Sequence, residues 1–395
     1  MKPRLSFVLF SALLSHGGGR ETWLNNILPE LLTRDDFGAI DVYFISDTTT
    51  KCHPKIATYD DPRINFIETR LPVCSNKAMA ILRIVVFCWC VAGRLRRRPA
   101  EQHFVVAIGT FYEGAVLALL KVLKRRPPLL IAWIRGVWSK EIYHRHGALM
   151  QRIINTVERQ FLSRADLILS NGNDTKAFYE RLLDRHVEAI PNALDLEKYA
   201  AVSRRAFSSP SRTVSFIGRL SEEKGLRAYL QGIESYLTDH PADDLTFEIV
   251  GDGPLRGLVE AFAAKYGRWV RYLGPLSNEN MLAYLETIDA GVCLTYSGNS
   301  GGGGVSNGLL ELIGAGRLVI AWASPIFNQV LDDTQGFLVT EGDIAQLTQC
   351  FVALDPDDAR LRIAHSKDVL PRYSLETHVE KFVGYLRAGL KNAGR

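Results

Sequence analysis

The chain has 395 residues, of which 47% are hydrophobic and 23% are charged, and its formal net charge is +4. This length exceeds one ordinary domain and predicts two globular units, and the composition excludes a disordered or low-complexity chain. The six cysteines include no C-x-x-C pair, so a reducing compartment is expected and a zinc site or a disulfide framework is not.

The first half alternates short apolar runs with longer helical patterns. A basic, apolar N-terminus also resembles a secretory signal, but no small-x-small cleavage site follows, so a buried first strand is preferred. Strands that alternate with helices predict a parallel, doubly wound sheet. The predicted strands are 5–13, 40–47, 64–70, 104–109, 129–136, 165–171 and 187–192, and the predicted helices are 20–33, 78–93, 112–124 and 148–163.

Residues 78–93 form the most apolar segment. It has 16 residues and includes Arg83, which is short of the ~20 apolar residues that a membrane span needs. We expect a buried helix here and no membrane-spanning segment. Cations follow this helix and the next one (Arg94, Arg96, Arg97, Arg98, Lys121, Lys124, Arg125 and Arg126).

These cations have two open interpretations. Helix C-termini favour positive charge, so they can be ordinary solvated ends. Alternatively, they form a basic face that makes peripheral contact with anionic membrane lipids. Nucleic acid is not an expected partner, because no stripe of aromatic and basic side chains accompanies them.

The polar segment 201–214 is the best linker candidate, and the alternation restarts after it. A second doubly wound half is therefore predicted, and open α/β sheets bind ligands at the carboxyl ends of their strands. The expected fold class is α/β, with two Rossmann-like domains facing a central cleft. The predicted strands are 214–220, 245–253, 270–274, 290–296, 317–323 and 336–340, and helices are predicted up to 237 and at 254–266, 277–287, 307–315 and 374–390.

The segment VSFIGRLSEEKG (214–225) carries the strongest functional signal. A buried strand ends at Gly218, so Arg219 lies at its carboxyl end and Lys224 follows at the start of the next helix. Two fixed cations beside a helix N-terminus can bind a diphosphate and stabilise charge on a departing phosphate oxygen. The alternative is that Arg219 only ends a strand and Lys224 only lies on a solvated turn.

A second signal is the loop and helix at 297–316. Its four glycines, Gly301 to Gly304, permit close backbone approach to a ligand. Ser306 or Asn307 can cap the helix, whose first free N–H groups would point at an anion. Glu311 is expected on the first turn, where it can accept hydrogen bonds from ribose hydroxyls or merely complement the helix dipole.

A weaker signal is the glycine turn in HGGGRE (16–21), after the first strand. Such a turn lets backbone N–H groups approach a phosphate. The spacing of a dinucleotide-binding loop is absent, and the turn can equally be a plain connection.

In combination, VSFIGRLSEEKG, FEIVGDGP (247–254), VRYLGPLSNENM (270–281) and GVSNGLLELIGAGRLVIA (304–321) resemble the retaining glycosyltransferases of family 4, which have the GT-B fold. The first half resembles the family more loosely, through HGGGRE and AIPNALDLEKY (189–199). The resemblance implies an acceptor-binding domain over 1–200, a nucleotide-sugar-binding domain over 201–370, and a C-terminal helix, 371–395, that crosses back to the first domain.

The resemblance also implies roles for single residues. Arg219 and Lys224 match the diphosphate-binding pair that assists catalysis, and Glu311 matches the carboxylate that binds the ribose. Acceptor contacts would come from the first half. The implied acceptor residues are His16, Arg135 and Trp138, and the further implied donor contacts are Gly18, Gly19, Gly218, Gly274, Gly303, Gly304, Ser306, Asn307, Leu309 and Leu310.

Three positions depart from the family pattern. Gly303 stands where a second glutamate usually contacts the donor sugar, Arg135-Gly136 replaces a histidine-glycine pair, and Gln329 replaces a common glutamate. The phosphate-binding residues are thus intact, while the sugar-binding side is altered.

The function implied is transfer of a hexose, with retention, from a nucleotide-diphosphate sugar to an acceptor hydroxyl. The expected donor is a UDP- or GDP-sugar, and the expected acceptor is a sugar or a lipid-linked glycan in bacterial surface polysaccharide or glycoconjugate synthesis. The expected location is the cytoplasm, at the inner face of the membrane. No metal or other cofactor is expected, because two side-chain cations would replace a metal.

The alternatives are a nucleotide-sugar epimerase or a phosphorylase on the same fold, and a non-catalytic relative that binds nucleotide sugars. The glycine at position 303 keeps the non-catalytic alternative open.

Overall fold

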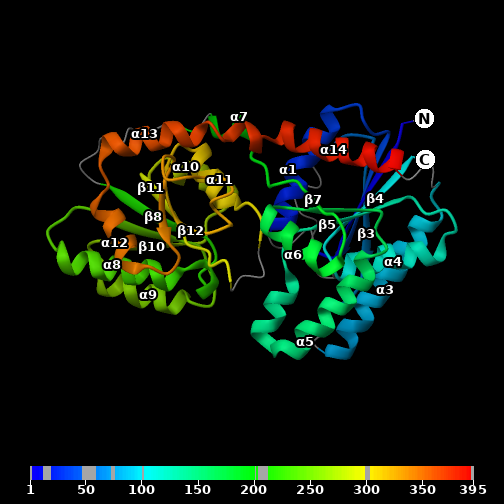
Figure 1. The fold of residues 1–395 in the computed structure, drawn as a ribbon, viewed down its shortest axis with the longest axis horizontal. Helices are drawn as coiled ribbons and strands as arrows, with labels where there is room; N and C mark the ends of the chain where they lie inside the picture. Colours follow the sequence, from blue (N-terminus) through cyan, green and yellow to red (C-terminus); the bar gives the residue numbers. More distant parts are fainter. Residues whose placement is uncertain are drawn as a thin grey trace. The chain divides into compact units, whose positions relative to one another are not determined.

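The computed structural model describes residues 2–392, except 12–18, 47–58, 73–75, 100–101, 201, 203–211 and 299–302. The chain divides into two compact units (Figure 1). Unit 1 comprises Met1–Pro191, Gly301–Gly304 and Leu375–Arg395, and unit 2 comprises Asn192–Ser300 and Val305–Ser374.

Unit 1 contains a seven-stranded sheet in the order β3-β2-β1-β4-β5-β6-β7, with every neighbouring pair parallel. Its central strands β1, β4 and β5 are mostly apolar because helices cover both faces. The strands are β1 (Arg4–Leu9), β2 (Ala39–Ser46), β3 (Ile64–Arg70), β4 (His103–Ile108), β5 (Leu129–Ile134), β6 (Leu167–Ser170) and β7 (Glu188–Ala189).

Two helical layers cover the unit 1 sheet. On one face, α1 (Gly19–Thr33) and α14 (Leu375–Asn392) bury Trp23 and Phe382 against the strands. On the other face, the core includes residues of α3 (Lys77–Arg96), α4 (Tyr112–Leu123), α5 (Trp138–Leu162) and α6 (Asn173–Leu183).

The predicted C-terminal helix is present as α14, and it is amphipathic. Val379, Phe382, Val383 and Leu386 follow helical spacing, and all four are buried in the unit 1 core.

Unit 2 contains a six-stranded sheet in the order β10-β9-β8-β11-β12-β13, again with every pair parallel. In both sheets the chain order reverses beside the first strand, between β1 and β4 and between β8 and β11. The strands are β8 (Thr213–Ile217), β9 (Thr246–Val250), β10 (Val270–Gly274), β11 (Ala290–Cys293), β12 (Leu318–Ala323) and β13 (Phe337–Thr340).

One hydrophobic core joins the unit 2 sheet to its helices. The predicted pair of Rossmann-like, doubly wound α/β domains is therefore confirmed. The helices are α7 (Leu196–Ala200), η1 (Glu222–Lys224), α8 (Leu226–Asp239), α9 (Arg256–Lys265), α10 (Asn278–Leu285), α11 (Asn307–Gly314), α12 (Ile344–Val352), α13 (Pro356–Lys367) and η2 (Leu370–Tyr373).

Several element bounds differ from the prediction. Helix α5 consists of two helical segments on either side of Gly147, whose φ of 78° and ψ of −179° are not helical, so the predicted helix at 148–163 is its second segment and the first, from Trp138, was not predicted. The first strand ends at Leu9, and 12–18 lie outside the described residues, as does most of the predicted linker. Helices α12 and α13 were not predicted.

The predicted helix at 78–93 is present as α3, but the prediction that it is buried is wrong. Phe87, Cys88 and Val91 enter the core, but Ile81 and Trp89 are 63% and 60% exposed. Length and composition alone would also allow Ala78–Arg96 to cross a membrane, and only 28% of its most apolar window is buried in the protein. The helix is apolar on all sides, and the core covers only part of its circumference.

Candidate functional site

The carboxyl edge of the unit 2 sheet brings Arg219 and Lys224 to the point where the strand order reverses. Arg219 follows the central strand β8, and the Lys224 ammonium donates a hydrogen bond of 3.4 Å to the hydroxyl of Thr295, just after the neighbouring strand β11. Open α/β sheets bind their ligands at such a reversal. The two predicted diphosphate ligands therefore lie at the expected edge of one sheet.

The two cations are close enough to influence each other. Burial lowers the pKa of Lys224, and the charge of Arg219 adds to that lowering, while Cys293 and Glu223 oppose it. Arg219 is exposed. Among the described residues neither cation forms an ion pair with a carboxylate, so both charges are available to an anion.

Tight backbone contacts hold the loops of this edge in place. An ideal Cβ on Gly251 would lie 1.8 Å from the carbonyl oxygen of Gly218, and one on Gly225 would lie 2.2 Å from that of Leu294. The Gly251 N–H donates to the carbonyl of Gly274 at 2.9 Å. Only glycine fits at 251 and 225, which explains these positions in the IVGDG and EEKG motifs.

Helix α11 begins at Asn307, with Ser306 as its N-cap. The Ser306 hydroxyl accepts the N–H of Leu309 at 3.4 Å, and its carbonyl accepts the N–H of Leu310 at 3.2 Å. The predicted cap is confirmed. Because Leu309 and Leu310 already donate within the cap, the N–H groups of Asn307 and Gly308 at the helix start are better placed for an anion.

The prediction that Glu311 lies on the first turn of α11 is wrong. The helix starts at Asn307, and its first turn contains no acidic residue. Burial raises its pKa to about 7, while the charge of Lys198 and a hydrogen bond from Tyr199 lower it. Burial also raises the pKa of Cys293 to about 12, which Lys224 opposes and Glu311 reinforces. The charges of Lys224 and Glu311 are thus both close enough to influence the Cys293 thiol at the end of β11.

The glycine-rich segment before α11 is attached to the start of α6, and its described part, Gly303 and Gly304, belongs to unit 1. The Asn171 side-chain amide donates to the carbonyl of Gly303 at 2.8 Å. The Gly304 N–H donates to the two carboxylate oxygens of Asp174 at 2.9 and 3.1 Å.

Position 303 has no room for a side chain. An ideal Cβ there would lie 2.4 Å from the Thr175 hydroxyl and 2.6 Å from the Asp174 carboxylate. A glutamate would require the start of α6 to move. Asp174 therefore places a carboxylate beside the position where the resembled family carries its second glutamate.

The corresponding edge of the unit 1 sheet contains an ion pair that sequence reasoning missed. Glu113 is buried and accepts the Phe10 N–H at 2.8 Å and an Arg20 guanidinium N–H at 3.0 Å. Burial raises the pKa of Glu113, and Arg20 opposes the rise. This edge holds a carboxylate paired with a cation, where the cations of unit 2 have no carboxylate partner among the residues that the structure describes.

The two predicted acceptor residues that the structure describes, Arg135 and Trp138, lie in separate clusters. The Arg135 guanidinium lies 5.1 Å from the centre of the Trp23 ring, and burial together with the charge of Arg20 lowers its pKa. Trp138 packs instead on Phe111 and Tyr112, with ring centres 4.9 and 5.8 Å away. His16 and Gly18 lie outside the described residues, and Gly19 starts α1.

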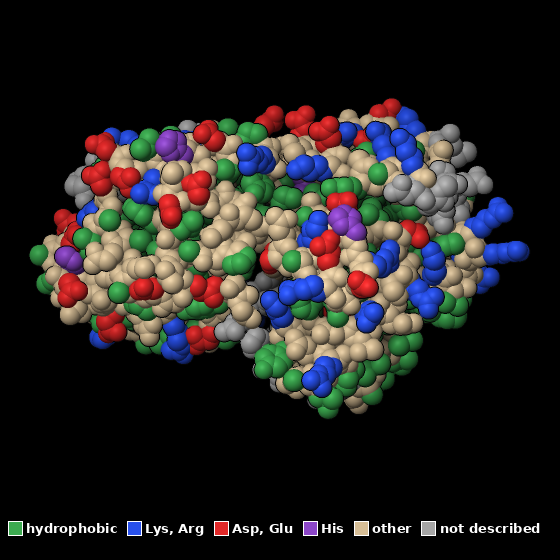
Figure 2. Space-filling view, in the orientation of Figure 1, with side chains coloured by type: hydrophobic (Ala, Val, Ile, Leu, Met, Phe, Trp, Pro, Cys, Tyr) green, Lys and Arg blue, Asp and Glu red, His purple; other side chains and the backbone are tan. Residues whose placement is uncertain are grey.

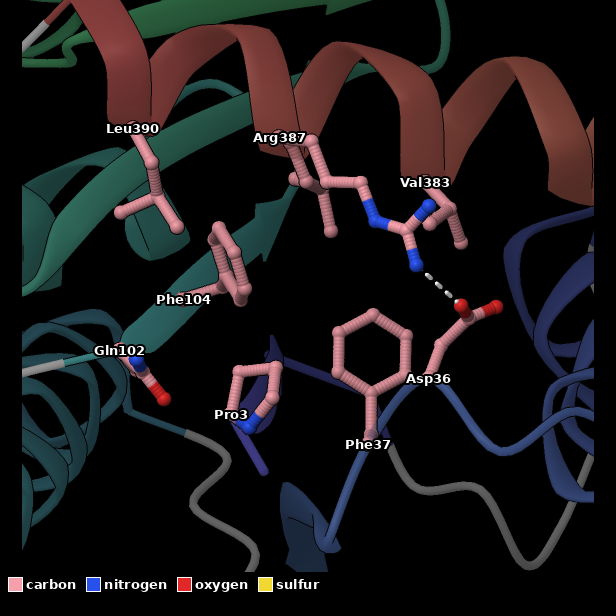
Figure 3. A pocket seen from close by; sticks show the side chains of 9 residues that line it. Pro3, Asp36, Phe37, Gln102, Phe104, Val383, Arg387 and Leu390 are labelled. Atoms are coloured by element: carbon pink, nitrogen blue, oxygen red, sulfur yellow. Dashed lines mark hydrogen bonds and ion pairs between the residues drawn. The ribbon is translucent and has the colours of Figure 1, made fainter. Parts of the chain in front are cut away.

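A hollow of about 230 Å³ lies at the opposite, amino-terminal edge of the unit 1 sheet, beside the starts of β1 and β4 (Figure 3). Phe37, Phe104 and Leu390 contribute an apolar lining. The lining cation, Arg387, is paired with Asp36 at 2.6 Å. Because that charge is already neutralised, the hollow is poorly suited to a diphosphate.

Sequence reasoning also missed Thr295, Tyr199 and Asp174. Thr295 lies near the end of the predicted strand 290–296, so only knowledge of the strand order could have placed it beside Lys224. Tyr199 lies in the motif AIPNALDLEKY, and nothing in that motif indicates its hydrogen bond to Glu311. Asp174 gave no signal, because its partner Gly304 is 130 residues away.

Comparisons with known proteins agree with this geometry. Residues 211–355 match the family Glycosyl transferases group 1. The chain is 28% identical over 212 residues to 2-deoxystreptamine glucosyltransferase of Streptomyces kanamyceticus, covering 50% of this chain and 53% of that enzyme. It is 27% identical over 326 residues to 2-deoxystreptamine N-acetyl-D-glucosaminyltransferase of Streptomyces fradiae, covering 77% and 74%.

The match thus spans about half the length of the first relative and about three quarters of the second. Among solved structures, HepE of Anabaena in complex with UDP aligns with a TM-score of 0.72 at 16% identity, over 98% of this chain and 100% of that one. That likeness shows the GT-B fold. The resemblance to glycosyltransferases is therefore confirmed, and the similarity to the glycosyl transferases of group 1 lies in residues 211–355.

Proposed function

We propose that the chain transfers a hexose from a nucleotide-diphosphate sugar to an acceptor hydroxyl, and that Arg219 and Lys224 bind the donor diphosphate. The observation that carries this proposal is the pair of cations at the strand-order reversal of unit 2, neither of which is paired with a described carboxylate. A concentrated positive charge left unpaired at a ligand-binding edge suits an anionic ligand.

In the proposed reaction, the bond between the anomeric carbon and the diphosphate oxygen breaks, and that oxygen leaves with the electron pair. The acceptor hydroxyl oxygen forms the new bond to the anomeric carbon, and its proton passes to the leaving diphosphate or to solvent. Arg219 and Lys224 stabilise the charge that grows on the leaving oxygen. Retention of configuration rests on the resemblance alone.

The remaining donor contacts follow from α11. Its first N–H groups, at Asn307 and Gly308, add donors for a phosphate. Glu311, when ionised, can accept hydrogen bonds from the ribose hydroxyls. Because burial raises its pKa to about 7, this binding should strengthen as the pH rises through neutrality.

We propose that no metal takes part, because two side-chain cations supply the charge that a divalent ion supplies in other phosphate sites. Excess chelator should leave the rate unchanged. A loss of activity that Mg²⁺ or Mn²⁺ restores would contradict this part of the proposal.

Two acceptor classes have support. The relatives named above act on 2-deoxystreptamine, which favours a small polar acceptor. A lipid-linked glycan in bacterial surface polysaccharide synthesis is favoured by the cations that follow α3 and α4. A cytoplasmic location is consistent with the free thiols of Cys88, Cys90, Cys293 and Cys350.

The first experiment is a thermal-shift screen against UDP, GDP, ADP and TDP and their sugars. A nucleotide that binds the native state raises the melting temperature by mass action, and UDP or GDP is expected to give the largest rise. If none of them changes the melting temperature, or if Arg219→Ala keeps the full shift, the diphosphate site is not the one proposed.

Product analysis then separates the alternatives. A transferase consumes donor only with an acceptor, an epimerase converts donor without one, and a phosphorylase depends on inorganic phosphate. Tight nucleotide binding without donor consumption would favour a non-catalytic relative, in line with the altered position 303.

A further inference from the structure

One face of unit 1 exposes large apolar side chains. Nine of them, from α3 and α5, have exposed fractions between 40% and 74%. Soluble proteins rarely leave a contiguous apolar area of this kind uncovered unless it binds something. We call it the apolar face, and its residues are Met79, Ile81, Leu82, Val85, Trp89, Tyr143, Leu149, Met150 and Ile153.

The apolar face is built from parts of two helices that extend past the core. The end of α3 packs through Val91, Ala92 and Leu95, while its first turns do not. Helix α5 is kinked at Gly147, and exposed apolar residues flank the kink. Figure 1 draws α5 and the start of α3 at the lower end of unit 1, and Figure 2 shows hydrophobic side chains gathered there, with a cationic side chain among them.

The segment that carries this face is strongly cationic. Residues 77–165 contain sixteen Lys and Arg against four Asp and Glu, whereas acids outnumber bases in the rest of the chain. Two of the four acids, Glu113 and Glu158, are buried. Arg83 and Arg152 lie within the same turns as the exposed apolar residues.

We propose that the apolar face docks this protein onto an anionic lipid bilayer, with the exposed side chains of α3 and α5 inserted among the headgroups. A bilayer offers an apolar layer beneath a negative surface, and the face offers apolar side chains within a positive segment. A second copy of the chain is a less suitable partner, because two positive segments would repel each other. A nucleic acid is also less suitable, because it offers no apolar layer to bury Ile81 and Leu82.

The face is suited to docking on a membrane and not to spanning it. The end of α3 is held in the core by Phe87, Cys88 and Val91, so the helix cannot leave unit 1 without unfolding part of it. Trp89 and Tyr143 are of the residue types that favour the membrane–water interface, and Arg83 and Arg152 can reach phosphates with their charged ends.

This inference deepens the proposed function in one respect: if the chain is a transferase, a membrane-bound protein receives its acceptor from the lipid surface. The docking itself does not depend on the transferase activity, and it is tested without donor or acceptor.

The test is flotation of the full chain with vesicles of phosphatidylcholine, with and without phosphatidylglycerol. Binding is expected only to the anionic vesicles, and it should weaken as salt is raised, since screening reduces the attraction. No binding to anionic vesicles at low salt would overturn the proposal, as would equal binding to both vesicle types.

The decisive variant is Ile81→Gln with Leu82→Gln and Trp89→Gln, which keeps the helix and its charge. We expect vesicle binding to fall by about tenfold or more, because each side chain removes buried apolar area. The matched control is Val352→Gln with Leu361→Gln, which changes two exposed apolar residues of unit 2. If the control falls equally, or the variant does not fall, the apolar face is not the docking surface.

Two further measurements keep the outcome interpretable. Light scattering on the unmodified chain is expected to give the mass of a monomer. If it gives a dimer, and the triple variant is a monomer, the apolar face serves self-association and the proposal is overturned. The thermal shift with UDP should be the same for the variant and the parent, so a failure of docking is distinguished from a failure of the donor site.

Discussion

The carboxyl edges of the two sheets share a topology but differ in how their charges are used. In unit 1, Arg20 lies 3.0 Å from Glu113, a carboxylate that is 2% exposed. In unit 2, Arg219 is exposed, and within the described part of the chain Lys224 donates only to a neutral hydroxyl. The carboxyl edge of the unit 1 sheet therefore holds a cation paired with a carboxylate. The carboxyl edge of the unit 2 sheet holds cations that are not paired with a described carboxylate.

This difference teaches how to separate structural charges from ligand-binding ones. A cation whose partner is a buried carboxylate contributes to stability, and its removal leaves that carboxylate unpaired. A cation without such a partner contributes little to the folded state and is free for an anion. Mutating each kind should therefore change a different measurement.

The largest effect is expected for Lys224→Ala. Turnover with saturating donor should fall by about a hundredfold or more, by analogy with the loss of one preorganised donor. The melting temperature without ligand should change little, because no described carboxylate loses a partner. Steady-state kinetics and a thermal melt measure both, with Lys265→Ala as the control, since Lys265 is paired with Glu234 on the surface of unit 2.

Activity of Lys224→Ala within a few-fold of the parent would remove Lys224 from the mechanism. It would also leave unit 2 without the feature that distinguishes its edge from that of unit 1.

Arg20→Ala should show the opposite pattern. It leaves Glu113 buried without its ion-pair partner, so the free energy of unfolding should fall by about 2 kcal/mol, a figure reduced because Arg20 is itself partly exposed. Urea denaturation followed by tryptophan fluorescence measures the change. Thermal shifts with UDP should persist in this variant, and losing them while stability is unchanged would reverse the assignment of the two edges.

Gly303→Ala tests whether the segment before α11 is held as tightly as its contacts imply. The new methyl group would collide with Thr175 and Asp174, so we expect a loss of about 1–3 kcal/mol in stability. Gly298→Ala is the matched control, because a Cβ at Gly298 meets nothing within 4 Å. Thr175→Ala should recover part of the loss, and equal melting temperatures for both glycine variants would show that position 303 is not confined.

Acid should weaken unit 1 through His378. Burial lowers the pKa of His378 to about 3, and the ring accepts the Trp23 indole N–H at 2.9 Å. Below pH 6.5 this histidine is protonated in the unfolded chain and neutral in the folded chain. The free energy of unfolding should therefore fall by about 1.4 kcal/mol per pH unit from pH 6.5 downward. His378→Gln should have a shallower slope between pH 6.5 and 5, and an unchanged slope would contradict the buried neutral ring.

The smallest effect concerns Glu311 in unit 2, where pH should act on binding. A carboxylate with a pKa near 7 is mostly protonated at pH 6 and mostly ionised at pH 8, so donor affinity should rise by up to about tenfold over that range. Glu311→Gln should bind more weakly and lose this dependence. Calorimetric titration with UDP at both pH values measures it, and a parent affinity that falls with pH would exclude the ribose role.

Arg219, Lys224 and the α11 cap could be predicted because each lies in a short motif beside a predicted strand or helix. Strand order could not, since it depends on which strands pair, and so Thr295 was missed. The exposure of α3 was also beyond reach, because an apolar run has no periodicity to show which side faces the core. Helix α13 was missed although Asp355 followed by Pro356 is a helix-start signal.

One feature of unit 1 determines how the chain can be divided and when it can finish folding. Helix α14 covers Phe7, Trp23 and Trp133, yet it is synthesised only after all of unit 2. During synthesis, these aromatic side chains of unit 1 therefore stay uncovered until α14 has been made. A fragment that ends near residue 200 would keep that surface exposed and should aggregate, whereas adding Leu375–Asn392 as a separate peptide should restore its solubility.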